Sequence, residues 1–335
     1  MIPAVARATA SQDFVALPWR PGMSHPVIGS EYTAMTKALG FNADFPGDPY
    51  ILAEQGLPGA GYVGSMGAFR ETKLAPDGVR RKCLHDPAIR REVSARVQEI
   101  APIHESEGFF AVGIADEAFL SSRHERSELC FGPHTKEAYR LWLRRRYESL
   151  SALNTQWGTT YAAWDEVIPA RTEDVRGKEN FGPFVDFRTF MTDAWIEACE
   201  EVAAGYASAA PSVAMGHTNT FGANPFNGND YWKLATQTGF AWGQEYSEAI
   251  KHTAHKAIFD IWRSFVDTPE ARRSRAVNGA GREFFNYGWV GYRHTAPAAA
   301  YEPWWIALHG GRGVSYFATN ALDVSRGACW ALIYP

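Results

Sequence analysis

The sequence has no run of about 18 apolar residues, the length that a membrane-spanning helix needs, so no membrane span is expected. Its charged residues form no long block of one sign, and the net charge is −4, which argues against a nucleic-acid or membrane surface. The four cysteines form no CxxC pair, so neither a zinc knuckle nor a disulfide framework is indicated. The first residues lack the charged and then apolar build of a signal peptide. Together these absences predict a cytoplasmic protein with reduced thiols.

Several cofactor and catalytic motifs are also missing. No GxGxxG follows a strand and no GxxxxGK(S/T) occurs, which disfavours nucleotide binding. The ten histidines show no HExxH spacing, and a metal-dependent barrel hydrolase would require clustered histidine and acidic ligands that the sequence does not show. No GxSxG elbow is present, which disfavours a serine hydrolase of that kind. We therefore expect no metal and no other cofactor.

Aromatic residues are plentiful, with twelve Trp, fourteen Tyr and twenty Phe. Large cores absorb many of these, but several tryptophans stand in polar or Gly-rich contexts, among them Trp157, Trp242 and Trp289. Flat aromatic faces flanked by carboxylates suit pyranose rings, which have apolar C–H faces and hydroxyl edges. These three tryptophans are candidate sugar platforms, and each could equally belong to the core.

Strands and helices alternate along the chain, which predicts a parallel sheet with helices outside it. Helices are expected over 87–104, 136–150 and 186–207. Eight candidate strands favour a (β/α)8 barrel, a TIM barrel, over an open sheet. Strands are expected near 13–18, 41–45, 60–65, 211–217, 240–245 and 313–317, whereas 270–290 is ambiguous. One domain over 1–335 is expected, with 118–185 as an insertion over the barrel mouth.

The strand that begins at Phe109 is the most informative one, because it is apolar and then runs into Asp116 and Glu117. In parallel α/β folds, ligands and chemistry lie at the carboxyl ends of strands. Glu117 is therefore the candidate acid/base of a glycosidase. The like charge of Asp116 would raise the pKa of its carboxyl group. Alternatively, these acids cap the next helix or pair with an arginine.

A glycosidase needs a second carboxylate, about 5–5.5 Å from the first if it retains configuration and about 6.5–9.5 Å away if it inverts. Glu283, between a Gly-rich segment and aromatic residues, is the first candidate, and Glu245, at the end of a strand, is the second. His217 ends the strand expected at 211–217 and Asn219 follows it, and both could bind sugar hydroxyls. A histidine satisfied by the protein itself is an equal alternative.

One segment after Cys130 is specific enough to indicate a family. It contains Trp142-Leu143, Arg146-Tyr147, Leu153-Asn154 and Trp157-Gly158-Thr159, and it is followed by Asp186-Phe187-Arg188 and by Asp230 to Ala235. These motifs resemble those of glycoside hydrolase family 42, the β-galactosidase type, and matches run from about residue 110 to 318.

The resemblance implies that Glu117 is the acid/base after the fourth strand, that Tyr246 flanks the nucleophile, and that the nucleophile follows strand seven. Asp116 stands where the family usually has an Asn that touches the sugar 2-hydroxyl. The family's Met-Glu pair is missing, as are its zinc cysteines apart from Cys130. The family's C-terminal domains are expected to be absent.

The sequence thus predicts a retaining glycosidase of β-linked sugars, with β-galactosides as the first guess and a carbohydrate as its partner. The alternative is a catalytically impaired carbohydrate-binding barrel that has lost the nucleophile, which the missing Met-Glu pair favours. The apolar segment 330–335 would be exposed unless it packs or meets a partner, which leaves a homo-oligomer open.

Overall fold

The computed structural model describes most of the barrel and the whole of the region between 128 and 219. The described residues are 14–18, 34, 37–45, 56–63, 82–116, 119–121, 128–219, 225–238, 240–246, 260–261, 263–265, 268–271, 273, 286–290 and 296–316, with the backbone alone for 218–219, 240–246, 286–290, 296 and 298–299.

Seven parallel strands form one sheet, in which β1 and β2 are the two edges. The strands are β1 (Val15–Pro18), β2 (Gly59–Tyr62), β3 (Phe109–Gly113), β4 (Ala214–Asn219), β5 (Phe240–Tyr246), β6 (Asn286–Val290) and β7 (Gly313–Tyr316). Their order is β1-β7-β6-β5-β4-β3-β2, so each strand from β2 to β7 lies beside the next one in the chain, as in a barrel.

A short segment, 42–45, joins the two edges of this sheet. On one side the backbone N–H of Asn42 donates to the carbonyl of Ala16 at 3.2 Å. On the other side the N–H of Ala60 donates to the carbonyl of Asp44 at 2.8 Å, and Asp44 forms a parallel bridge with β2. The segment therefore supplies the eighth parallel position and closes the ring, and the predicted (β/α)8 barrel is confirmed.

The strands divide the apolar side chains between an inner and an outer core. On β1, Val15 and Leu17 face inward, whereas Ala16 packs toward the helices, as the alternation of a strand requires. The inner core draws on five neighbouring segments of the ring, and it consists of Val15, Leu17, Ala43, Phe45, Ala60, Phe110, Ala111 and Ala214. The barrel interior is thus filled by side chains, and a ligand must bind at one of its ends.

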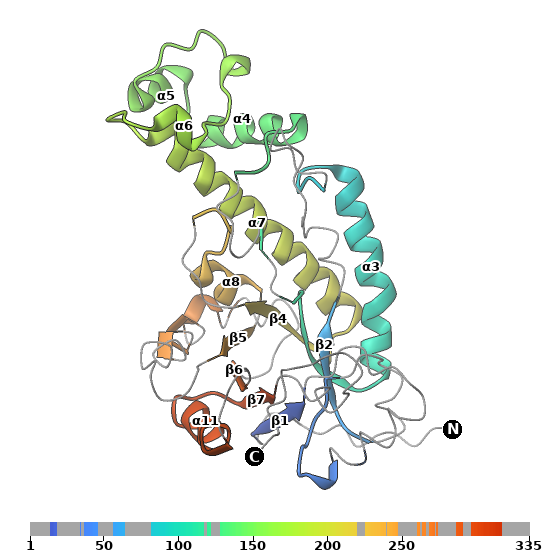
Figure 1. Cartoon of the computed structure of the whole chain (residues 1–335). Coiled ribbons are helices and arrows are strands. Elements are labelled where there is room, and N and C mark those ends of the chain that lie inside the picture. The colour runs from blue at the N-terminus through green and yellow to red at the C-terminus, as the bar shows by residue number, and fades with distance from the viewer. Residues whose placement is uncertain are drawn as a thin grey trace, which may run out of the picture.

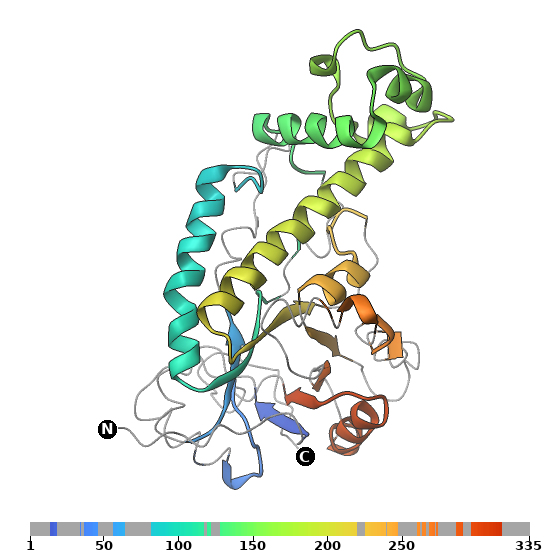
Figure 2. The same ribbon diagram turned by 180° about the vertical axis from the view of Figure 1, so that it is seen from behind.

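Two long helices, α3 (Pro87–Ser106) and α7 (Gly182–Ala209), run side by side along one flank of the barrel (Figures 1 and 2). α3 begins where the Asp86 carboxylate accepts the N–H of Ala88 at 2.8 Å, with Pro87 at the first helical position. The predicted helices over 87–104 and 186–207 are confirmed. α8 (Tyr231–Gln237) and α11 (Ala296–Leu308) cover other strands.

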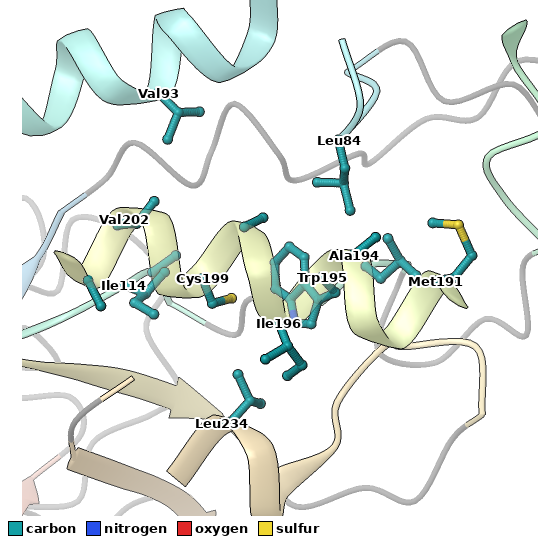
Figure 3. Close-up of a cluster of buried hydrophobic side chains, with 14 of the residues drawn as sticks. Leu84, Val93, Ile114, Met191, Ala194, Trp195, Ile196, Cys199, Val202 and Leu234 are labelled. Atoms are coloured by element: carbon teal, nitrogen blue, oxygen red, sulfur yellow. The ribbon is translucent and has the colours of Figure 1, made fainter. Parts of the chain in front are cut away.

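α7 packs its apolar side chains on both neighbours. Figure 3 shows Val93 of α3 directed toward α7 on one side and Leu234 of α8 directed toward Ile196 on the other. Trp195, in the middle of α7, is 1% exposed and is the largest fully buried side chain among the described residues. Burial of this size stabilises the fold by about 2–3 kcal/mol for each large side chain. α7 therefore forms the centre of the outer core.

The residues expected to form an insertion fold into α4 (Pro133–Tyr147), α5 (Leu150–Trp157) and α6 (Thr172–Val175). These three helices gather around the first turns of α7, away from the strands (Figures 1 and 2). The single helix expected over 136–150 is wrong in one respect, because α4 ends at Tyr147. Glu148 takes a φ of 56°, and the Ser149 side chain then caps α5 by accepting the N–H of Ala152.

Among the residues described, no helix has the length and apolar character needed to cross a membrane.

Candidate active site

The carboxyl ends of β2 and β3 bring two polar side chains together. Tyr62 is the last residue of β2, and its hydroxyl donates to Oδ1 of Asp116 at 3.1 Å. The Tyr62 ring packs edge-on against Phe45, which belongs to the inner core, with 4.8 Å between the ring centroids. Asp116 is partly exposed and follows β3 by three positions. A carboxylate thus lies at the barrel mouth, oriented by a phenol whose ring is fixed in the core.

Glu117 itself lies outside the described residues, but the structure describes the chain on both sides of it. Asp116 precedes it, and the described chain resumes two positions after it with the segment 119–121, whose side chains are buried. The N–H of Leu120 donates to the carbonyl of Asn227 at 2.8 Å, so this segment is tied to the loop after β4. The chain around the candidate acid is therefore anchored at two points.

The two candidates for the second carboxylate differ in their relation to the strands. Glu245 is the last residue but one of β5, so its backbone lies at the carboxyl edge of the barrel. Glu283 lies outside the described residues, three positions before β6 begins at Asn286. A residue at that point of the chain precedes its strand, whereas the chemistry of such barrels takes place after the strands. The order of elements therefore favours Glu245 over Glu283.

Four further predicted site residues are placed by strand register, from the backbone. Tyr246, at the end of β5, is the register partner of Trp289 on β6. Asn219, at the end of β4, pairs with Gly243 on β5. Trp242 pairs with Tyr287, and this pair lies farther from the carboxyl edge than the pair of Tyr246 and Trp289. Tyr246, Trp289 and Asn219 thus share the carboxyl edge with Asp116.

His217 lies on the outer side of the barrel. On β4, Ala214 belongs to the inner core and Met215 to the outer core, so His217 shares the side of Met215. Its Nδ1 is 3.4 Å from the Thr238 hydroxyl oxygen, and that hydroxyl donates to the carbonyl of Leu234 at 2.6 Å. Burial lowers the pKa of His217 from 6.5 to about 3. This position favours the alternative in which the protein, not a sugar, satisfies the histidine.

Trp157 belongs to the core of the α4–α6 region. It is 3% exposed, and its indole N–H donates to Oδ2 of Asp186 at 2.8 Å. Asp186 also accepts from the Tyr147 hydroxyl and pairs with Nε of Arg146 at 3.1 Å. The structure therefore supports the core role for Trp157 that the sequence left open. It also gives the motif residues of this sequence a structural role, because Trp157, Tyr147 and Asp186 form one cluster.

The described cysteines and acids do not form a metal centre. Cys83, Cys130 and Cys199 form no disulfide, and Cys329 lies outside the described residues. In the part of the chain that the structure describes, no three His, Cys, Asp or Glu side chains are grouped closely enough to hold a metal ion.

Sequence reasoning missed Tyr62 and Asn227, which hold the segment around Glu117. Tyr62 is 54 positions away from Asp116 along the chain, and Asn227 makes its contact through a backbone carbonyl. A tyrosine as the last residue of a Gly-rich strand was the one available signal for Tyr62. The carbonyl of Asn227 gives no signal in a sequence.

Comparison with known proteins identifies the family of this chain. The family model described as β-galactosidase, of glycoside hydrolase family 42, matches residues 70–278. β-Galactosidase BglY of Alicyclobacillus acidocaldarius is 30% identical over 155 residues, which are 42% of this chain and 21% of that protein. A β-galactosidase of an Arthrobacter species is 24% identical over 243 residues, which are 69% of this chain and 31% of that protein.

Solved structures show the same fold at low identity. A catalytic mutant of Gan42B, a GH42 β-galactosidase from G. stearothermophilus, superposes with a TM-score of 0.69 at 16% identity, over 93% of this chain and 52% of that one. The chain thus spans about half the length of this solved relative, and the matched parts cover less than a third of the two curated relatives.

Proposed function

We propose, from the premise that this chain belongs to glycoside hydrolase family 42, that it hydrolyses β-linked sugars, β-galactosides first, with retention of configuration. The observation that carries the proposal is the Asp116–Glu117 pair directly after β3, within the matched residues, with Asp116 oriented by Tyr62 at the barrel mouth. The curated relatives that support it are themselves named β-galactosidases. We also propose a cytoplasmic location for such an enzyme, with which the reduced state of the described cysteines is consistent.

In the proposed mechanism Glu117 acts first as an acid and then as a base. It donates its proton to the glycosidic oxygen while the second carboxylate attacks the anomeric carbon, so that one C–O bond forms as the other breaks. The sugar is then bound to the enzyme as an ester. Glu117, now ionised, removes a proton from water, which attacks the same carbon and releases the carboxylate. Both steps pass through a transition state with positive charge at the anomeric centre.

We propose Glu245 as the nucleophile, with Glu283 as the alternative. Glu245 belongs to a strand end at the edge that also holds Asp116, and its neighbour Tyr246 is paired in register with Trp289. These two aromatic residues are the proposed walls of the sugar site, together with Trp242. Asn219 is a proposed hydrogen-bonding partner of the sugar.

One observation favours a second candidate function, a carbohydrate-binding barrel without a nucleophile. With segment 42–45 counted as the second position, β6 is the seventh strand of the barrel, after which the family resemblance places the nucleophile. The residues that follow β6, 291–295, include no Asp or Glu. Such a protein would bind β-galactosides and leave them intact.

The test is hydrolysis of a panel of aryl β-glycosides by the wild type and by Glu117→Ala, Glu245→Ala and Glu283→Ala, with and without azide. Glu173→Ala, which removes an exposed acid of α6, is the matched control. We expect Glu117→Ala to lose about 10²- to 10⁴-fold in rate on poor leaving groups. We expect azide to restore Glu245→Ala and to give a glycosyl azide of inverted configuration.

Each remaining outcome decides between the alternatives. An inverted azide from Glu283→Ala would make Glu283 the nucleophile. Retained activity in all three variants would refute the two-carboxylate assignment. A wild type that binds galactosides and cleaves none of the panel would establish the binding barrel.

A further inference from the structure

The segment that surrounds Glu117 is held from two directions. Before Glu117, Asp116 accepts a hydrogen bond from Tyr62 at 3.1 Å. After it, the N–H of Leu120 donates to the carbonyl of Asn227 at 2.8 Å, and the Leu120 side chain is 2% exposed within the outer core. Since three peptide bonds separate Leu120 from Glu117, a shift of Leu120 moves the backbone that carries the acid.

The loop after β4 that receives Leu120 is itself fixed to α7. The indole N–H of Trp195 donates to Oδ1 of Asn229 at 3.0 Å. Oδ1 of Asn227 accepts the N–H of Asn229 at 2.9 Å, and Asn227 is 2% exposed. Two bonds thus hold residues 227–229 against α7, where Trp195, labelled in Figure 3, is 1% exposed.

Gly228 lies at the contact between this loop, Leu120 and α7. Its φ is +76°, in the left-handed region that glycine adopts without a steric penalty. A Cβ atom at this position would lie 2.9 Å from Cβ of Leu120 and 3.2 Å from Cβ and Cγ of Trp195. Carbon atoms pack at about 3.5–4.0 Å, so the two neighbours would have to move apart. Neither Cβ atom can swing aside by rotating its side chain, so the backbone must shift.

We infer that Gly228 is a positioning residue for the acid/base segment, because only glycine lets the loop after β4 approach closely enough to hold Leu120 in place. The inference rests on the proposed function in so far as it concerns catalysis. The contact between Gly228 and Leu120 fixes the backbone after Glu117, and the hydrogen bond from Tyr62 to Asp116 fixes the backbone before it. A displacement of about 1 Å at a reacting group is enough to cost about 10²-fold in rate.

The test compares Gly228→Ala with Gly177→Ala. Gly177 has nearly the same backbone angle, with a φ of +72°, but no atom lies within 4 Å of its added Cβ. Both variants therefore carry the cost of a non-glycine residue at positive φ, but only Gly228→Ala places a Cβ atom too close to its neighbours. kcat/KM is measured on phenyl and on 2,4-dinitrophenyl β-galactosides, because a poor leaving group needs the acid and a good one does not.

We expect Gly228→Ala to lose at least ~10-fold on the phenyl substrate and less than ~3-fold on the dinitrophenyl substrate, with Gly177→Ala within ~2-fold of wild type on both. Equal losses on the two substrates, or no difference between the variants, would overturn the inference. If Gly228→Ala does not fold, Tyr62→Phe, which removes the other anchor and adds no atom, must show the same dependence on the leaving group.

A second readout does not depend on activity. Hydrogen exchange of the peptide that contains Leu120 should be ~10-fold faster in Gly228→Ala than in wild type and Gly177→Ala, since the bond from Leu120 to Asn227 is the one disturbed. Unchanged protection would refute the inference. Faster exchange in a protein that cleaves no galactoside would support the inference and reject the proposed function.

Discussion

At the scale of single residues, two aspartates show how surroundings decide what a carboxylate does. Asp186 is 3% exposed, and tryptophan, tyrosine and arginine donors surround it. Asp116 is partly exposed at the barrel mouth, and Tyr62 donates to one of its oxygens. A buried carboxylate with several donors is fixed and structural, whereas a partly exposed one at the barrel mouth is able to meet a ligand.

Asp116→Asn is predicted to change the pH dependence of catalysis. The carboxylate of Asp116 adjoins Glu117 in the chain, and a like charge raises the pKa of a neighbouring carboxyl group. The amide keeps an oxygen to accept the hydrogen bond from Tyr62 and removes the charge. In the proposed mechanism Glu117 is the general acid and must be protonated, so the alkaline limb of kcat/KM should move to lower pH.

The measurement is the pH profile of kcat/KM on a substrate with a poor leaving group. Glu173→Gln, an exposed change on α6, should leave both limbs in place. An alkaline limb that stays fixed in Asp116→Asn would mean that the charge of Asp116 does not act on the acid.

At the scale of elements, the residues of the family motif connect α4 and α5 to α7. Tyr147 ends α4, Trp157 ends α5, and both donate to Asp186 of α7, although the three residues are spread over 40 positions of the chain. Asp193, two turns further along α7, likewise accepts from Trp142 of α4 at 3.1 Å. The conformation of α4 and α5 therefore depends on polar contacts with one face of α7.

Asp186→Asn is predicted to lower the free energy of unfolding by about 2–4 kcal/mol. The amide can keep an oxygen in the place of Oδ2, which accepts from both Trp157 and Tyr147, but both bonds then lose their charged acceptor. The amide NH2 group also stands where Oδ1 pairs with Nε of Arg146, so that ion pair is lost. Urea unfolding measures the change. Glu173→Gln breaks an exposed pair with Arg176 and should cost less than about 0.5 kcal/mol. Similar values for the two variants would contradict a central role for Asp186.

The strands and helices with a clear apolar period were predictable from the sequence, and those fixed by distant contacts were not. α3 and α7 show their apolar faces in the sequence, and the strand from Phe109 is apolar throughout. The start of β6 lies in the stretch 270–290, where no period is visible, and this start is the reason why we propose Glu245 before Glu283. The break between α4 and α5 depends on the backbone angle of Glu148, which the residue type does not reveal.

The same contrast holds for the candidate site. Asp116 and Glu117 stand out because a buried strand should not run into two acids. The partners of this segment are Tyr62 and the carbonyl of Asn227, which come from other strands and meet it only in the closed barrel. His217 and Trp157 were ambiguous because the sequence does not say which face of a strand or helix is buried against the protein.

At the scale of the whole molecule, neutral histidines in the outer core link folding to pH. His104 and His217 are each 4% exposed, and burial is the main cause that lowers their pKa values to about 4 and about 3. His85, half-buried beside Phe190, has a pKa lowered to about 4, again chiefly by burial. The unfolded chain binds protons near pH 6.5 and the folded protein does not.

The folded protein is therefore predicted to lose stability as the pH falls from about 6.5 toward 4. Each of these histidines contributes a slope of up to ~1.4 kcal/mol per pH unit in this window, because only the unfolded state is protonated there. Above pH 7 the contribution of the histidines is constant. Urea unfolding at pH 7, 6 and 5 measures the slope of the unfolding free energy against pH. His104→Phe should reduce this slope by the amount that corresponds to about one proton. The variant also loses the hydrogen bond to Tyr206, so we expect it to be less stable at every pH. A slope identical to that of wild type would mean that His104 takes up its proton in the folded state.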